Sequence, residues 1–214
     1  MNTFVCKGFI FDVDATLVDT TQVINNIWRK WATQNAIEFS KVLPHVHGRK
    51  ISETLALVGS KYSNPEEEAV VKKIAMEAMN AATEIDGALD FVSTIPLHSW
   101  SIATSGPRKV AETSLRASGF QIPANMICAE DVTNGKPHPD PFLLAAQNLG
   151  LDAGNCVAFE DSPAGVKSAK DAGCFTVAIL TSHEKEDLLL ADLIVDGFSD
   201  LTLKRRNNQY ELCW

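Results

Sequence analysis

The sequence predicts an α/β fold in which a Rossmann-like parallel-sheet core carries a small all-helical cap inserted after the first strand. Beyond Gly87, short apolar segments alternate with helical segments, as is typical of parallel sheets with right-handed crossovers. Prolines at the starts and glycines at the ends of these helical segments support the assignment. Between residues 20 and 85, apolar residues instead recur at helical spacing without any strand signal.

The expected core strands are short apolar segments that end among polar residues. They are residues 7–12, 101–103, 126–129, 156–159 and 175–179. In a parallel sheet the carboxyl ends of neighbouring strands face the same edge, and ligands bind beyond that edge. The residues that follow each strand are therefore the candidates for a functional site.

The inserted segment contains three helical stretches. Val23, Ile27 and Trp31 recur at helical spacing in the first stretch, and Asn64-Pro65 forms an N-cap and first-turn proline at the start of the third. We therefore expect two domains. They are an α/β core over residues 1–17 and 87–214, and a helical cap over residues 18–86.

Composition excludes several classes of protein. The chain has 214 residues, 45% of them hydrophobic and 21% charged, which suits a globular protein with a real core. Its net charge of −8 argues against binding to nucleic acid or to an anionic membrane surface. We expect the only compact basic run, Lys204-Arg205-Arg206, to be a solvated terminal loop. Five cysteines without metal-site spacing suggest reduced thiols and a cytoplasmic location. The sequence leaves the oligomeric state open, and the chain could be a monomer.

Residues suited to phosphoryl transfer gather at the predicted strand ends. They are Asp12 and Asp14, then Thr104, Ser105 and Gly106, then Lys136, and finally Glu160 and Asp161. Carboxylates bind a hard divalent cation, preferably Mg²⁺, which also takes phosphate oxygens. A second carboxylate can protonate a leaving oxygen and later deprotonate water. Lysine, hydroxyl groups and backbone amides can hold the remaining phosphate oxygens.

These residues also resemble the motifs of the haloacid dehalogenase (HAD) superfamily. Asp12-Val13-Asp14-Ala15-Thr16 resembles its first motif, Thr104-Ser105 the second, Lys136 the third, and Glu160-Asp161 the fourth. The order and positions match over essentially the whole chain, and the helical segment resembles the cap of the subgroup containing sugar phosphatases and β-phosphoglucomutase. The resemblance implies Mg²⁺ as cofactor and a small phosphorylated sugar or polyol as substrate.

The resemblance also implies a role for each residue. Asp12 would be the nucleophile that forms an aspartyl-phosphate, and Asp14 the general acid and base. Asp12 and Asp161 would supply carboxylate ligands to the metal, Asp14 its backbone carbonyl, and Glu160 a ligand or a neighbour of one. Thr104 and Lys136 would bind the phosphoryl group, together with the amides of Ser105 and Gly106. In the cap, His47-Gly48-Arg49 resembles the specificity loop of sugar phosphatases, from which Arg49 could reach the substrate.

One residue departs from the family pattern. The family usually has glycine where this chain has Ala15. A positive φ at this position would strain the loop or shift Asp14, because alanine lacks the conformational freedom of glycine. We expect a negative φ at Ala15, with which the substitution would be harmless.

Two alternatives to a phosphatase stay open. A mutase of the β-phosphoglucomutase kind usually lacks the threonine at position 16 and carries a histidine early in the cap, whereas this chain has Thr16 and no histidine between residues 20 and 29. A non-catalytic phospho-acceptor module of the receiver type would need neither the inserted helices nor Asp14. Dehalogenation is disfavoured, because that reaction does not need the second aspartate.

Overall fold

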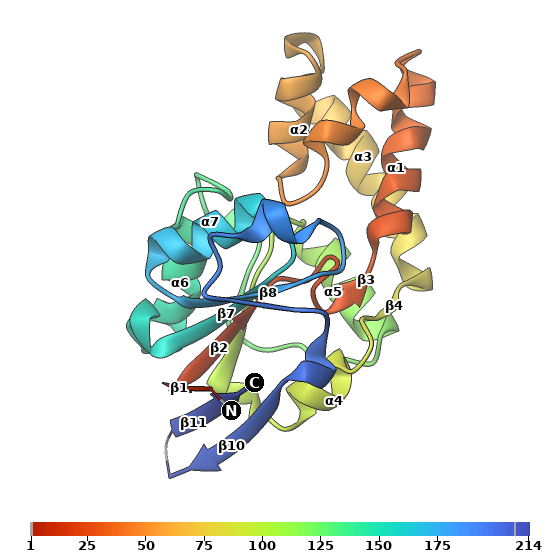
Figure 1. Cartoon of the computed structure of the whole chain (residues 1–214). Helices are drawn as coiled ribbons and strands as arrows, with labels where there is room; N and C mark the ends of the chain where they lie inside the picture. Colours follow the sequence, from red (N-terminus) through yellow and green to blue (C-terminus); the bar gives the residue numbers. More distant parts are fainter. Residues whose placement is uncertain (1, 208) are drawn as a thin grey trace.

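The computed structural model describes residues 2–207 and 209–214, and a parallel β-sheet lies at its centre (Figure 1). Six strands pair in the order β6-β5-β2-β7-β8-β9, every neighbouring pair being parallel. They are β2 (Gly8–Phe11), β5 (Trp100–Ala103), β6 (Met126–Ile127), β7 (Cys156–Glu160), β8 (Phe175–Ile179) and β9 (Leu193–Val195). The five predicted strands are confirmed to within two residues, and β9 is an additional edge strand.

Helices cover both faces of this sheet. They are α4 (Ala88–Ser93), α5 (Arg108–Ala117), α6 (Asp140–Asn148) and α7 (Pro163–Ala172). Side chains alternate between the two faces along a strand, so Phe9 and Phe11 of β2 pack in the cluster that includes α4 and α5. Ile10, between them, packs in the cluster that includes α6 and α7. This double burial explains why the strands are continuously apolar rather than alternating.

The predicted punctuation of the helices is present. Pro163 is the first residue of α7, Pro141 lies in the first turn of α6, and Pro107 directly precedes α5. The glycines after the three helices have positive φ angles, with values of 86°, 70° and 92° at Gly119, Gly150 and Gly173. These positions therefore need the freedom that glycine provides.

A second, antiparallel sheet joins the two ends of the chain. Its strands are β1 (Thr3–Cys6), β10 (Thr202–Arg206) and β11 (Gln209–Cys213), in the order β1-β11-β10. The expectation that Lys204-Arg205-Arg206 forms a loop is wrong, because these residues lie in β10. Their side chains are nevertheless exposed, and the strand exists because β11 supplies its hydrogen-bonding partners.

The segment that follows the first strand of the parallel sheet is helical, and we call residues 18–86 the helical insertion. It contains β3 (Val18–Asp19), α1 (Thr21–Gln34), α2 (Ile51–Val58), α3 (Pro65–Ala78) and β4 (Thr83–Glu84). The two short strands pair antiparallel where the insertion joins the core. Sequence periodicity does not reveal them, because two residues are too few to show an alternation.

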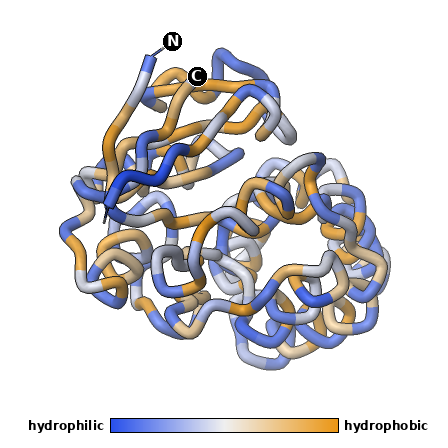
Figure 2. Tube along the Cα trace, turned by 90° about the horizontal axis from the view of Figure 1, so that it is seen from below, coloured by the Kyte–Doolittle hydropathy of each residue, from blue (hydrophilic) through white to orange (hydrophobic). Residues whose placement is uncertain are grey.

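The helical insertion has a hydrophobic core of its own. Trp31 is fully buried there, its Nε1–H donates to Glu67 Oε2 over 2.7 Å, and its ring packs edge-on against Trp28 and Tyr62. Val110 of α5 belongs to the same cluster, so the insertion also packs against the core. Viewed from below, the Cα trace forms two lobes, and hydrophobic residues occur in both (Figure 2).

None of the helices in the described part of the chain is long and apolar enough to cross a membrane. All five cysteines are buried free thiols. Burial raises the pKa of Cys6, Cys128, Cys156 and Cys174 to about 12, so these thiols stay protonated and unreactive at neutral pH.

Candidate active site

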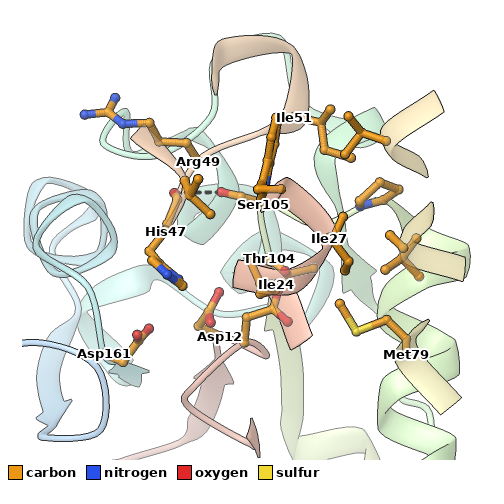
Figure 3. Close-up of a pocket in the computed structure, with 18 residues that line it drawn as sticks. Asp12, Ile24, Ile27, His47, Arg49, Ile51, Met79, Thr104, Ser105 and Asp161 are labelled. Carbon is orange, nitrogen blue, oxygen red and sulfur yellow. Dashed lines mark hydrogen bonds between the residues drawn. The ribbon is translucent and has the colours of Figure 1, made fainter. Parts of the chain in front are cut away.

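The predicted site residues meet at the carboxyl edge of the parallel sheet, below the helical insertion (Figure 3). Strand pairing continues just past the strand ends, because Asp12 N donates to Phe159 O over 3.0 Å and Thr104 N donates to Ile127 O over 2.9 Å. Asp12, Thr104 and Asp161 line one pocket together with residues of the insertion. The parallel topology thus brings together side chains that are between 57 and 149 residues apart in sequence.

Lys136 forms the electrostatic centre of the site. Its Nζ lies 2.5 Å from Asp12 Oδ1 and 2.5 Å from Glu160 Oε1, and its side chain is only 1% exposed. Burial alone would lower the pKa of this ammonium, but the two carboxylates outweigh that effect and raise the pKa above its usual value. Lys136 therefore carries a permanent positive charge between the first and fourth motifs.

Glu160 is held rigidly from both sides. Its Oε1 accepts from Lys136, while its Oε2 accepts from the backbone N–H groups of Asp161 and Ser162 and from Ser162 Oγ. Gly165 leaves room for this carboxylate, because a Cβ there would lie 1.8 Å from Glu160 Oε1. Both oxygens of Glu160 are thus engaged with the protein, and this geometry suits a residue that positions Lys136.

Three buried carboxylates form a cluster that fits a divalent cation. Asp12, Glu160 and Asp161 each offer an oxygen, and these atoms lie within 4.8 Å of one another. Burial, and then neighbouring negative charge, raises the pKa of Asp161 to about 8; burial also raises the pKa of Asp12, despite the nearby Lys136. Clustered carboxylate oxygens suit Mg²⁺, and the charge of a bound cation would favour the ionised form of these groups.

Two hydroxyl groups orient Asp161. Thr16 Oγ1 donates to Asp161 Oδ1 over 3.4 Å, and Ser182 Oγ donates to Asp161 Oδ2. His183 Nδ1 lies 2.7 Å from Ser182 Oγ and extends this network. Sequence reasoning missed Ser182, because it lies outside every recognisable motif.

Asp14 is separate from the carboxylate cluster. Thr20 Oγ1 donates to Asp14 Oδ1 over 2.7 Å. Burial raises the pKa of Asp14, although the Thr20 hydrogen bond and the charge of Lys136 oppose this effect. A raised pKa favours the protonated form of the carboxyl group, which is the form that a general acid needs. Thr20 is a second site residue that sequence reasoning missed.

The second motif forms a tight turn at the end of β5. Gly106 N donates to Thr104 Oγ1 over 3.0 Å, so the hydroxyl proton of buried Thr104 is free to point into the pocket. The hydroxyl group of Ser105 is engaged with the insertion, because its Oγ donates to Gly48 O over 3.0 Å. Ser105 thus connects the core with the predicted specificity loop.

The predicted specificity loop is only partly directed at the site. The His47 ring points toward the Asp12 and Asp161 carboxylates, whereas the Arg49 side chain extends away from them (Figure 3). His47 Nε2 lies 3.0 Å from Asn25 Oδ1, and burial followed by the nearby His183 lowers the pKa of His47. Gly48 has a φ of 76°, and a Cβ there would lie 2.7 Å from Ser162 Oγ.

The expected negative φ at Ala15 is wrong. Ala15 has a φ of 60° and is buried. Its backbone is fixed by the turn that follows the first strand, in which Ala15 N donates to Val18 O over 2.8 Å and Val18 N donates to Val13 O over 2.9 Å. Alanine therefore stands in the left-handed conformation that glycine adopts without strain.

We predict that Ala15→Gly raises the free energy of unfolding by about 0.5–1 kcal/mol. The left-handed conformation costs alanine about 1–2 kcal/mol, and the greater freedom of unfolded glycine offsets about 0.4–1 kcal/mol of the gain. Denaturant unfolding measures the change. Ala36→Gly is the matched control, because Ala36 is exposed and has a φ of 54°. If Ala36→Gly raises the free energy of unfolding and Ala15→Gly does not, the prediction that backbone strain at Ala15 lowers the stability of the protein is wrong.

Gly165→Ala is predicted to lower the free energy of unfolding by about 1–3 kcal/mol, since an added methyl group must displace the Glu160 carboxylate from its partners. The same unfolding measurement tests this. Gly197→Ala provides the control: nothing lies within 4 Å of a Cβ at Gly197, and its φ is −173°. The control should change stability by less than about 0.5 kcal/mol. Equal effects of the two substitutions would contradict a packing role for Gly165.

Comparisons with known proteins agree with this geometry. Residues 9–179 match the family described as haloacid dehalogenase-like hydrolase. Hexitol phosphatase A of Escherichia coli (strain K12) is 33% identical over 208 residues, which are 95% of this chain and 96% of that protein. The β-phosphoglucomutase of Bacillus subtilis (strain 168) is 26% identical over 96% of both chains.

The fold has close counterparts among solved structures. A hydrolase from Pseudomonas syringae superposes with a TM-score of 0.78 at 23% identity, covering 89% of this chain and 94% of that one. The motif order, the carboxyl-edge site and these matches together confirm the resemblance seen in the sequence. The chain belongs to the haloacid dehalogenase-like hydrolase family.

Proposed function

We propose that this protein is a Mg²⁺-dependent phosphatase that hydrolyses small sugar or polyol phosphates through an aspartyl-phosphate intermediate. The observation that carries the proposal is the contact of Lys136 with Asp12 and Glu160, beside Asp161 and Thr104. This arrangement would provide a nucleophile, a fixed positive charge and a metal site at the carboxyl edge of the parallel sheet. The 33% identity to hexitol phosphatase A supports the substrate class.

In the first step, one carboxylate oxygen of Asp12 attacks phosphorus. Lys136 holds Oδ1 of this carboxylate, so the second oxygen, Oδ2, is the one available for attack. The bond between phosphorus and the substrate's ester oxygen breaks, and Asp14 donates a proton to that oxygen. The sugar or polyol leaves as a neutral alcohol, and Asp12 carries the phosphoryl group.

In the second step, water hydrolyses the acyl-phosphate. Asp14, now a carboxylate, accepts a proton as the water oxygen bonds to phosphorus. The bond between phosphorus and Asp12 breaks, and inorganic phosphate and free Asp12 are restored. The same carboxyl group thus serves as acid and then as base. Burial raises the pKa of Asp14, which favours the protonated form that the first step uses.

Lys136 and Thr104 would hold the phosphoryl oxygens, together with the amides of Ser105 and Gly106. Carboxylates of Asp12 and Asp161 and the backbone carbonyl of Asp14 would hold Mg²⁺. Glu160, whose two oxygens are engaged with the protein, would act beside this ligand set. The bound cation supplies positive charge that reduces repulsion between the anionic nucleophile and the anionic substrate.

We further propose that residues 18–86 act as a cap that covers the substrate, while residues 1–17 and 87–214 carry the chemistry. The paired strands β3 and β4 connect the two parts, and their position suits a hinge. His47 points into the pocket and Gly48 contacts Ser105, so this loop is placed to contact the leaving group. Arg49 would have to change its side-chain orientation to reach a substrate.

A mutase is the less favoured alternative within the family. The residue that argues against it is Thr16, whose hydroxyl donates to the proposed metal ligand Asp161 over 3.4 Å. Identity is also lower to the B. subtilis mutase than to the hexitol phosphatase. A cytoplasmic location is part of the same proposal.

The proposal predicts Mg²⁺-dependent release of inorganic phosphate from part of a panel of phosphate esters. The panel contains hexitol phosphates, glycerol 1-phosphate and fructose 1-phosphate, compounds for which relatives are named. EDTA should abolish release, because the acidic cluster then lacks its cation, and added Mg²⁺ should restore it. An isomerised sugar phosphate without phosphate release would instead support the mutase.

Asp12→Asn should lower kcat by at least about 10³-fold, since an amide oxygen cannot form the acyl-phosphate. The fold should persist, as Lys136 keeps Glu160 as a partner. Asp90→Asn makes the same change at an exposed site and should leave kcat unaltered. Phosphate release is the assay, and circular dichroism checks folding. Full activity of Asp12→Asn would remove the proposed nucleophile.

A further inference from the structure

Lys50 of the helical insertion is buried in an unusual way. Only 8% of this residue is exposed, and its Nζ donates to two backbone carbonyls of the core, Val132 O over 2.6 Å and Thr133 O over 3.3 Å. Within residues 2–207 and 209–214, no carboxylate oxygen lies within 4.0 Å of this ammonium. An ammonium removed from water in this way needs its carbonyl acceptors.

The contact is close and extends along the loop of residues 132–135. Gly135 faces Lys50 and Glu53: a Cβ at Gly135 would lie 2.9 Å from Lys50 Cε and 2.7 Å from Glu53 Oε1. Glu53 in turn accepts from Lys50 N through Oε2 over 3.1 Å, which fixes the start of α2. The lack of a side chain at Gly135 is therefore what allows the insertion to seat on this loop.

The same loop leads directly into Lys136. On the other side of Lys136, His138 N donates to Gly135 O over 2.9 Å, and Ser168 Oγ donates to His138 O over 2.5 Å, which anchors that end to α7. In the described part of the chain, the hydrogen bonds accepted by Val132 O and Thr133 O come from Lys50 alone. The core also holds this loop, through the packing of Val132 and a hydrogen bond from Asn134 Nδ2 to Asp140 Oδ2 over 3.1 Å. Lys50 is the contact by which the insertion holds its backbone carbonyls.

Residues 48–50 contact three of the segments that build the site. Gly48 O accepts from Ser105 Oγ, the Gly48 backbone packs against Ser162, and Lys50 binds the loop before Lys136. These contacts depend on the insertion lying on the core, because its covalent connections lie at β3 and β4. Movement of the insertion would return Lys50 to water and release the loop.

We propose that Lys50 is a positioning residue for Lys136, and that it couples the seating of the helical insertion to the placement of the lysine that holds Asp12 and the phosphoryl group. This inference rests on the proposed function for its catalytic consequence. Its structural part, a loop ordered by Lys50, is independent of any reaction. Lys50 touches no reacting atom, so its removal should affect all phosphate esters alike.

Kinetics of four variants test the catalytic part. Lys50→Met keeps the length of the side chain and removes its donors, and it should lower kcat at least 10-fold with KM changed less than threefold. The loss should be equal for two substrates with different leaving groups. Lys50→Arg can still donate to both carbonyls and should recover most of kcat. Gly135→Ala should reproduce the loss by displacing Lys50. Lys73→Met is the matched control, since Lys73 is an exposed lysine on α3, and should behave as the wild type.

Hydrogen exchange tests the structural part without any turnover. In Lys50→Met, the His138 amide, which donates to Gly135 O over 2.9 Å, should exchange at least 10-fold faster, while the amides of β2 and β7 keep their protection. An unchanged exchange rate at His138 would overturn the proposal. So would a defect confined to KM or to one substrate, which would indicate a substrate contact.

Faster exchange throughout the core in all Lys50 variants, with no recovery in Lys50→Arg, would indicate general destabilisation and would also overturn the proposal. If the wild type hydrolyses no ester, the proposed function fails, and exchange of the His138 amide still decides whether Lys50 orders the loop.

Discussion

Lys136 brings a fully buried positive charge to a sheet edge that otherwise collects carboxylates, and the surrounding structure is arranged around that charge. Burying a charged group without a partner is strongly destabilising. A buried ion pair is tolerated only when its members are in close contact and additional hydrogen bonds satisfy their remaining polar atoms. Lys136 meets this condition with carboxylate oxygens of Asp12 and Glu160 at 2.5 Å each. Glu160 is further fixed by Ser162 and by the space that Gly165 leaves open.

The carboxylates beside Lys136 are clustered closely enough to suit a divalent cation. Asp12, Glu160 and Asp161 each offer one oxygen within 4.8 Å of the others, and oxygen ligands of this kind are those that Mg²⁺ prefers. Asp14 lies outside this cluster and is bound to Thr20 instead. The separation gives two aspartates that are two residues apart different partners, because Asp12 contacts the ammonium of Lys136 and Asp14 accepts from the Thr20 hydroxyl.

The helical insertion contacts the candidate site through residues 48–50. The hydrogen bonds that join these residues to the core are accepted by backbone carbonyl oxygens. Ser105 and Lys50 both bridge the insertion and the core by bonding to carbonyl oxygens. Glycines at 48 and 135 permit these approaches, because a Cβ at either position would overlap a neighbouring side chain. Such contacts tie the position of the insertion to segments carrying the second, third and fourth motifs.

The sequence by itself determined the parallel core, the helical insertion and the residues of the four motifs, because these depend on local periodicity and on strand ends that topology must align. Tertiary structure alone decided the left-handed backbone at Ala15, the antiparallel sheet of the termini, and the supporting roles of Thr20, Lys50 and Ser182. A backbone angle is set by the hydrogen bonds of the whole turn, and an exposed strand forms only when a distant partner pairs with it. A hydroxyl or an ammonium acquires its role from the atoms that folding brings within 3 Å of it, and no local pattern in the chain records those neighbours.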